Sequence, residues 1–350
     1  MESGKPRPAE SGPKLTESPI AREHPELFHY TGIAGLEGIV RTQTLWATHA
    51  AFLNDALEIR AFAARLPSLL RASVKDGISA LIREHPANQS IVDKAGGLTT
   101  SAEQAASAIT EGMYRALLGA PDSPPFAEPY VTSFCTASSE LVARHGLLSQ
   151  WRGYGREGGY ALVFDTARLD LLLKAEAERW RHALFGGDVI YSFASDEEMR
   201  KELGSSIDEI AACINQWLVS AGKDDALEPV YNHLVMCACR YKHWGFHEEK
   251  EVRVIAIPPN RELFAEQKAR GLVQDEKPRH HFLHGGAPVP CIHLFEGVTT
   301  LPHQPLPITR IIVGPHRDQN RRCQAVEALL TEYQLHIPVA ASEIPFTDGS

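Results

Sequence analysis

The pattern of apolar residues along the chain predicts a series of short strands. β-Branched and aromatic residues cluster between turn-forming residues in several segments, which is typical of strands in a folded sheet. These segments are residues 27–31, 44–48, 129–135, 159–165, 251–257, 289–295 and 309–315. Pro258 and Pro259 end the fifth strand, because proline cannot donate a ladder hydrogen bond.

Helices are predicted where apolar residues recur at spacings of three and four. They fall at about residues 33–40, through a helical insertion at about 56–120, in two segments within 195–241, and at about 319–333. Thr100 with Glu103, and Asp225 with Glu228, have the spacing of capping boxes. Because strands and helices do not alternate regularly, the predicted fold class is α+β with a mixed or antiparallel central sheet.

The first residues differ in composition from the rest. Residues 1–24 are rich in proline, serine, glutamate and lysine and bury little apolar surface, so we expect a disordered N-terminal tail. We expect residues 25–350 to form a single α+β domain that contains the helical insertion.

Composition and charge exclude some classes of protein. Hydrophobic residues make up 43% of the 350 residues, enough for a sizeable core, and the six cysteines are scattered among apolar neighbours like reduced thiols. No apolar run reaches the roughly 18 residues of a membrane span, and no secretory signal is evident. We therefore expect a cytoplasmic protein without membrane contact. The net charge of −9 argues against extended nucleic-acid binding.

One histidine-rich segment holds candidate metal ligands. It contains His280, His281, His284, Cys291 and His293. Their spacing matches none of the common zinc patterns, so the sequence predicts no metal. A metal site would require at least three histidines and acids to meet within coordination reach.

The segment EEKEVRVI (248–255) places charges at the start of a buried strand. If the strand is already extended at Glu249, the side chains of Glu249, Glu251 and Arg253 point to one side of the sheet. Two carboxylates on one face demand a cation, which Arg253 or Lys242 can supply. Two interpretations follow: a charge cluster at a strand end, or carboxylates at the lip of a cleft.

Two other segments suggest a ligand for such a cleft. His29 lies in the first strand, and Trp151 and Tyr154 lie in a glycine-containing turn before another strand. Aromatic rings attract the cationic nicotinamide of NAD. A carboxylate beside the ribose stabilises the positive charge that develops as the nicotinamide bond breaks.

Several segments together resemble a known bacterial family. The segments LFHYTGIAGLEGIVRTQTLWATHAAFLND, YVTSFC, LLSQWRGYG, GGYALVFD, EEKEVRVI and ITRIIVGP are similar to the family catalogued as domain of unknown function 2971, over roughly residues 27–345. That family more distantly resembles the ADP-ribosyltransferase fold, in which a first-strand His or Arg, a middle Ser or aromatic element and a late Glu form the NAD site.

The resemblance implies roles for the matching residues. His29, with Thr31 beside it, would contact a ribose or position the nicotinamide, and Trp151 or Tyr154 would stack on the nicotinamide. Glu251 would hold the ribose 2′-hydroxyl as the catalytic residue.

Other matching residues are assigned less directly. Glu249 fits the first acid of an E-x-E pattern that orients an acceptor. Because SQWRGYG departs from the usual middle motif, Ser133 is an alternative polar contributor. Asn54 and Asp55 also match the family pattern, and capping the following helix is an alternative explanation for them.

Three functional hypotheses follow. The first is an NAD-dependent ADP-ribosyltransferase or NAD glycohydrolase with NAD as substrate, an unknown acceptor or water, and no metal, in a context such as toxicity or phage defence. It requires His29, an aromatic residue at 151 or 154, and Glu251 to converge on one cleft. The second is a non-catalytic nucleotide- or partner-binding module, in which Glu251 turns into a pair with Arg253. The third is a metal-assisted hydrolase.

Overall fold

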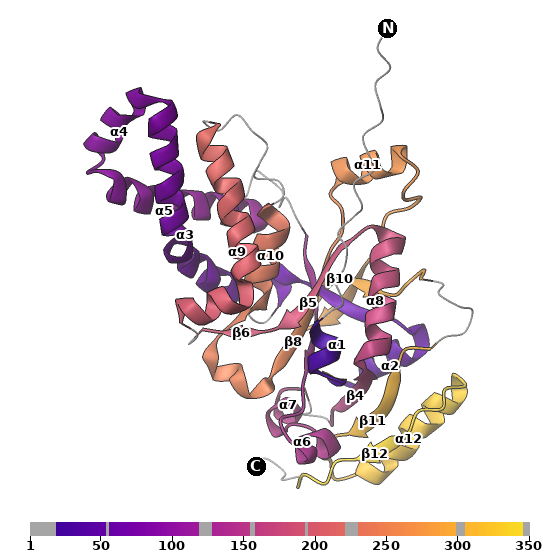
Figure 1. The fold of residues 1–350 in the computed structure, drawn as a ribbon. Helices are drawn as coiled ribbons and strands as arrows, with labels where there is room; N and C mark the ends of the chain where they lie inside the picture. The colour runs from indigo at the N-terminus through magenta and orange to yellow at the C-terminus, as the bar shows by residue number, and fades with distance from the viewer. Residues whose placement is uncertain are drawn as a thin grey trace.

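The fold is a mixed α+β arrangement built on one large, mostly antiparallel sheet (Figure 1). The computed structural model describes residues 19–53, 56–118, 128–154, 158–192, 195–220, 230–298 and 305–345. Its strands are β1 (Glu26–Thr31), β2 (Leu45–His49), β3 (Tyr130–Cys135), β4 (Tyr160–Asp165), β5 (Ala183–Asp188), β6 (Ile190–Tyr191), β7 (Tyr241–Lys242), β8 (Glu251–Ile257), β9 (Arg279–His284), β10 (Ala287–Leu294), β11 (Ile308–Val313) and β12 (Val339–Ala341). Every strand segment predicted from the sequence overlaps one of them.

The main sheet has ten strands and branches at β3. Eight strands follow the order β12-β11-β4-β1-β3-β2-β10-β9, while β8 pairs with both β3 and β5. One edge of β3 pairs with β8 along its length; its other edge is shared by β2, at Tyr130 and Val131, and β1, at Cys135. β1 and β2 therefore diverge from a common neighbour.

Helices cover both faces of the sheet (Figure 1). They are α1 (Pro19–Glu23), α2 (Ile33–Thr42), α3 (Ala56–Glu84), α4 (Gln89–Lys94), α5 (Leu98–Leu118), α6 (Glu140–His145), α7 (Leu148–Tyr154), α8 (Thr166–Trp180), α9 (Asp196–Val219), α10 (Val230–Arg240), α11 (Arg261–Ala269) and α12 (Gln319–Glu332), with 3-10 helices η1 (Ala50–Phe52), η2 (Pro86–Asn88) and η3 (Trp244–Glu249). α3, α5, α9 and α10 pack together over Ile255 and Ile257 of β8. α2, α8 and α12 enclose a second core that includes Val252 and Val254, as the alternation of side chains along β8 requires.

Local sequence signals explain where several helices begin. Ser195 accepts a hydrogen bond from the backbone of Glu198, and the Glu198 side chain accepts one from the backbone of Ser195, so a complete capping box starts α9. Asp165 ends β4 and caps α8 by accepting from the backbone of Arg168.

The N-terminal boundary of the fold differs from the prediction. Residues 19–23, assigned to a disordered tail, form α1, which packs on β5 and α8. Ile20 is buried there, against the bare backbone of Gly186. Burial of this one apolar side chain anchors the segment, whereas residues 1–18 lie outside the described residues.

Of the two capping boxes predicted from the sequence, one does not form and the other lies outside the described residues. α5 begins at Leu98, before Thr100, and the Thr100 hydroxyl donates back to the carbonyl of Gly96 instead of capping the helix. Asp225 and Glu228 lie outside the described residues.

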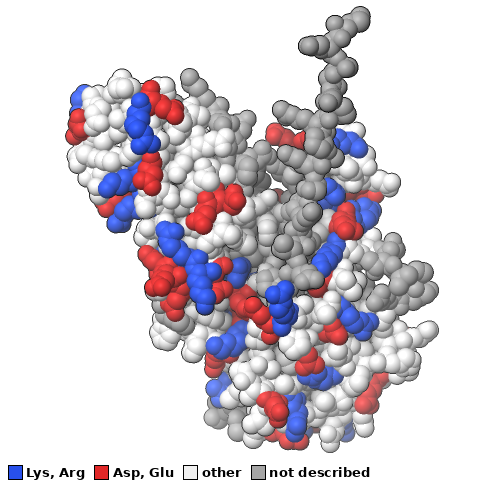
Figure 2. Space-filling view, in the orientation of Figure 1, with Lys and Arg blue, Asp and Glu red and all other residues white. Residues whose placement is uncertain are grey.

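The surface mixes charges of both signs. Figure 2 shows acidic and basic side chains interspersed among the described residues of the visible face. Across the described part of the chain, no helix combines the length and apolar content needed to cross a membrane. All six cysteines are free.

Gly314→Ala is expected to destabilise the fold. A Cβ at this position would lie 2.9 Å from the backbone oxygen of Gly159 and 2.8 Å from the ring of Trp151, which is buried. Overpacking of this kind costs about 1–3 kcal/mol, so the urea midpoint should fall. In Gly112→Ala, the control, the new Cβ meets nothing within 4 Å. The exposed helical position should gain up to about 1 kcal/mol. Equal midpoints would contradict the packing around Trp151.

Candidate functional site

The strand that carries the predicted carboxylates begins later than the sequence indicates. η3 runs to Glu249, and Lys250 then adopts a left-handed backbone with φ 44° before β8 begins at Glu251. Glu251 and Arg253 share a face of β8, as predicted, but Glu249 is not part of that strand. The prediction of three charged side chains on one extended face is therefore wrong for Glu249.

Glu251 is the centre of a buried charge network. Its side chain is 4% exposed, and its Oε1 accepts a hydrogen bond from Arg253 Nε at 2.7 Å. Its Oε2 accepts from Lys242 Nζ at 2.8 Å and from Arg253 Nη2 at 3.2 Å. Arg253 Nη1 also donates to the carbonyl of Cys239 in α10 at 2.7 Å. The backbone N–H of Glu251 donates to the hydroxyl of Tyr191 in β6 at 3.1 Å.

The network stays charged at neutral pH. Burial alone would raise the pKa of Glu251, but Arg253 and Lys242 outweigh it and lower that pKa to about 2. Burial would lower the pKa of Lys242, but Glu251 and Glu249 raise it above its ordinary value. Two carboxylates and two cations leave the four side chains without net charge.

Lys242 connects this network to the surface. Its Nζ donates to Glu249 Oε2 at 2.9 Å and lies 4.7 Å from the centroid of the Phe246 ring. Phe246 and Trp244 are 42% and 55% exposed, and we call these two residues the aromatic rim. The backbone N–H of Trp244 donates to Ser192 Oγ at 3.0 Å, which fixes the start of η3.

His29 and Glu251 lie on opposite faces of the sheet. Residues paired directly across antiparallel strands share a face; Phe28 pairs with Cys135, and Cys135 pairs with Glu251. His29 follows Phe28 on β1 and so points to the other face, where its ring centroid lies 5.7 Å from that of Phe134. The structure does not bring His29 and Glu251 together.

His29 reaches the branch of the sheet instead. Its Nδ1 donates to the carbonyl of Ser133 at 3.0 Å. Burial lowers the pKa of His29, and the bond to Ser133 opposes this only in part. Thr31 shares the face of His29, and its side chain leaves room only for glycine at Gly35. The Ser133 side chain lies on the opposite face, because Ser133 pairs with Arg253.

Of the two residues predicted to stack on nicotinamide, Trp151 is buried and the side chain of Tyr154 is outside the described part of the chain. Trp151 lies in α7 and not in a turn, is 4% exposed, and packs edge-on against Tyr30 with centroids 5.0 Å apart. Its Nε1 donates to the carbonyl of His145 at 3.0 Å. Trp151 is thus a core residue with no open face for a ligand. The side chain of Tyr154 lies outside the described residues, as do Asn54 and Asp55.

The histidine-rich segment forms the β9–β10 hairpin. His280 and His293 meet Glu296, which follows β10, with their ligand atoms within 4.8 Å of one another. Cys291 is buried, and His281 and His284 are exposed. Glu296 is not among the residues predicted from the sequence, although its position three residues after His293, just past a strand, is a usable signal.

Comparison with known proteins supports the family resemblance over part of the chain. A family model described as "Protein of unknown function (DUF2971)" matches residues 150–254, a range that includes Lys242, Glu251 and Arg253. No curated protein and no solved structure matches the chain.

Glu251→Gln is expected to destabilise the protein by about 3–5 kcal/mol, because it leaves Arg253 and Lys242 buried without their shared anion. The wild-type contribution also depends on pH. Since folding lowers the pKa of Glu251 from 4.5 to about 2, the stabilisation of about 3 kcal/mol is complete above pH 4.5 and is lost as the pH falls towards 2. Urea unfolding across this pH range measures both effects.

The exposed neighbour provides the control. Glu248→Gln removes the same charge from the surface of the same segment, where Glu248 is exposed, and should change stability by less than about 0.5 kcal/mol. If the two variants had equal stability, the buried network would not be a determinant of folding.

Proposed function

We propose that the chain is a non-catalytic binding module for a planar cationic ring, such as the nicotinamide end of NAD. The observation that carries this proposal is the engagement of both Glu251 oxygens by Arg253 and Lys242. A carboxylate stabilises a developing cationic sugar only if its charge faces that sugar. Here two buried cations already compensate the charge, so Glu251 organises the site and does not perform chemistry.

The aromatic rim supplies the binding surface. Exposed aromatic side chains are frequent at binding sites, and Trp244 and Phe246 lie two residues apart in a short, capped turn. Lys242 approaches the Phe246 ring, which leaves Trp244 as the main stacking surface. Exposed Glu248 follows Phe246 by two residues in the same turn, and its negative charge favours a cationic ring over a neutral one.

Trp244→Ala should weaken NAD binding by about tenfold or more, because stacking of one base on an aromatic ring contributes about 1–3 kcal/mol. Isothermal titration calorimetry of the full chain with NAD and with nicotinamide mononucleotide measures this. Leu141→Ala is the control: Leu141 is 70% exposed, far from the rim in sequence, and should leave the affinity unchanged.

The same preparations test for catalysis. We expect no nicotinamide release above the rate without protein, either alone or with cell lysate. Absence of NAD binding, or equal weakening by Trp244→Ala and Leu141→Ala, would contradict the binding proposal.

A second candidate is the NAD-consuming reaction on an ADP-ribosyltransferase-type scaffold, with transfer of ADP-ribose to an unknown acceptor or to water. The branch at β3 favours it, because β1 and β2 diverge there and His29 reaches the carbonyl of Ser133. Nicotinamide release that His29→Ala abolishes, and that His24→Ala retains, would replace the binding proposal with this one.

A further inference from the structure

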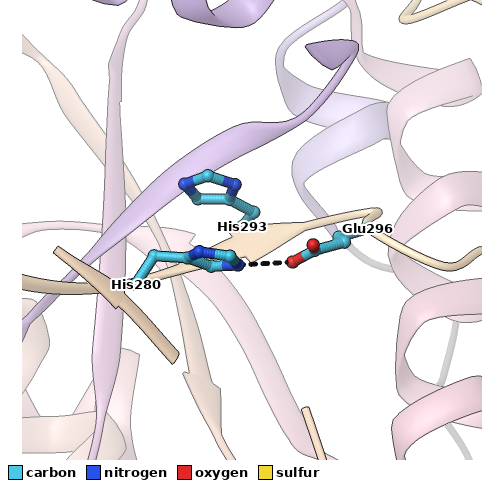
Figure 3. A group of neighbouring side chains, drawn as sticks. All are labelled: His280, His293 and Glu296. Atoms are coloured by element: carbon cyan, nitrogen blue, oxygen red, sulfur yellow. Dashed lines mark hydrogen bonds and ion pairs between the residues drawn. The ribbon is translucent and has the colours of Figure 1, made fainter. Parts of the chain in front are cut away.

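A compact group of potential metal ligands lies at the β9–β10 hairpin. His280 comes from β9, His293 from β10 and Glu296 from the turn after β10, and Figure 3 shows the three side chains gathered on one side of the hairpin. His280 Nε2 lies 2.8 Å from Glu296 Oε2, and all three ligand atoms fit within 4.8 Å. All three residues are partly exposed, so an ion has access from solvent.

The turn that carries Glu296 is held firmly. Phe295, just before it, has a left-handed backbone with φ 73°, which is unfavourable for a bulky residue unless its surroundings impose it. The backbone N–H of Phe295 donates to buried Glu176 Oε2 at 2.8 Å. The carbonyl of Glu296 accepts from Trp180 Nε1 at 3.1 Å and from Lys277 Nζ at 3.3 Å. These bonds fix the backbone from which the carboxylate projects.

The two histidine rings stack on each other. Their ring centroids are 3.9 Å apart with an interplanar angle of 14°, and Trp46 stacks on His293 at 5.6 Å and 9°.

The surrounding charges are compatible with a cation. Lys277, whose Nζ lies 3.3 Å from the carbonyl oxygen of Glu296, is itself paired with Glu176 through an Nζ–Oε1 distance of 2.6 Å. Glu296 contributes the negative charge. By contrast, the buried Glu251 network has its carboxylates saturated by cations.

We propose that His280, His293 and Glu296 bind one divalent transition-metal ion of the Zn²⁺ type, with a fourth position open to water. Two imidazoles and one carboxylate are the donor set of three-ligand zinc sites that keep an exchangeable position. Tetrahedral coordination at about 2.0–2.1 Å places ligand atoms about 3.3 Å apart, whereas the three ligand atoms now lie within 4.8 Å of one another. Metal binding would therefore turn the two imidazoles out of their stack by side-chain rotation. This assignment replaces the expectation of no metal, which rested on sequence spacing.

A second group offers the matched comparison. Glu23, His24 and Asp188 also bring ligand atoms within 4.8 Å of one another, and these are the two such groups among the described residues. This group has one imidazole, and Glu23 is exposed. Substituting His293 in the first group or His24 in the second therefore shows which group binds the metal.

The test is calorimetric titration of ZnCl₂ into the chelator-treated full chain, with Co²⁺ absorption as a report on coordination. Wild-type protein should bind one equivalent more than His293→Ala, and Co²⁺ should show the intense visible bands of a four-coordinate site. His293→Ala should weaken this site by about 100-fold or more, and Glu296→Gln by about tenfold or more, judged against the 10–100-fold effect of losing outer-shell partners. His24→Ala should keep the full stoichiometry.

The outcomes decide the assignment. Circular dichroism checks each variant; if His293→Ala does not fold, Glu296→Gln, whose side chain is 34% exposed in the wild type, gives the answer. No Zn²⁺ binding by the wild type would overturn the proposal. Binding that survives both His293→Ala and Glu296→Gln, or that disappears in His24→Ala, would also overturn it.

Discussion

The ion pair between Glu251 and Arg253 at the start of β8 is the interaction on which the surrounding structure depends. Removing these charges from water is costly, and the cost is offset only because each charge has several partners. The partners belong to different elements: Lys242 to β7, Cys239 to α10 and Tyr191 to β6. The network thus joins the helical layer to the sheet at the point where η3 turns into β8.

This arrangement ties the two ends of the segment with large exposed rings to each other. η3 carries Trp244 and Phe246, while Lys242, two residues before it, donates to Glu249 at its end. The charges below the aromatic rim are paired with one another. What the rim offers a ligand is therefore ring surface and the exposed carboxylate of Glu248, which supports the binding proposal more than catalysis.

The two polar clusters differ in how completely their members are paired. Around Glu251, the carboxylates and the cations saturate each other in the interior, as expected of groups that stabilise a fold. At the hairpin, Glu296 lies beside two stacked imidazoles at a partly exposed position. Stacking involves the faces of the rings and not the in-plane lone pairs of the ring nitrogens, which are the electrons that bind a metal. Saturated pairing favours a structural role for the first cluster, and the metal-binding proposal rests on the less complete pairing of the second.

The sequence by itself determined the α+β class and the elements with the clearest local pattern. Runs rich in β-branched and aromatic residues such as 129–135 and 251–257 became β3 and β8, and helical periodicity within 195–241 became α9 and α10. It also marked Glu251, Arg253 and Lys242 as a charged group at a strand end. These features depend on residues that are close in the sequence, so the local sequence pattern is enough to predict them.

Only the tertiary structure decided which of these residues meet. The left-handed backbone at Lys250 moved Glu249 off the strand, and the pairing of Phe28 with Cys135 put His29 on the face opposite Glu251. Likewise, Trp151 packs against Gly314, and Glu296 meets His280. The two residues of each pair are separated along the sequence. Strand register and the closing of long loops set these contacts, and a one-residue change of register reverses a face, so spacing along the sequence does not encode them.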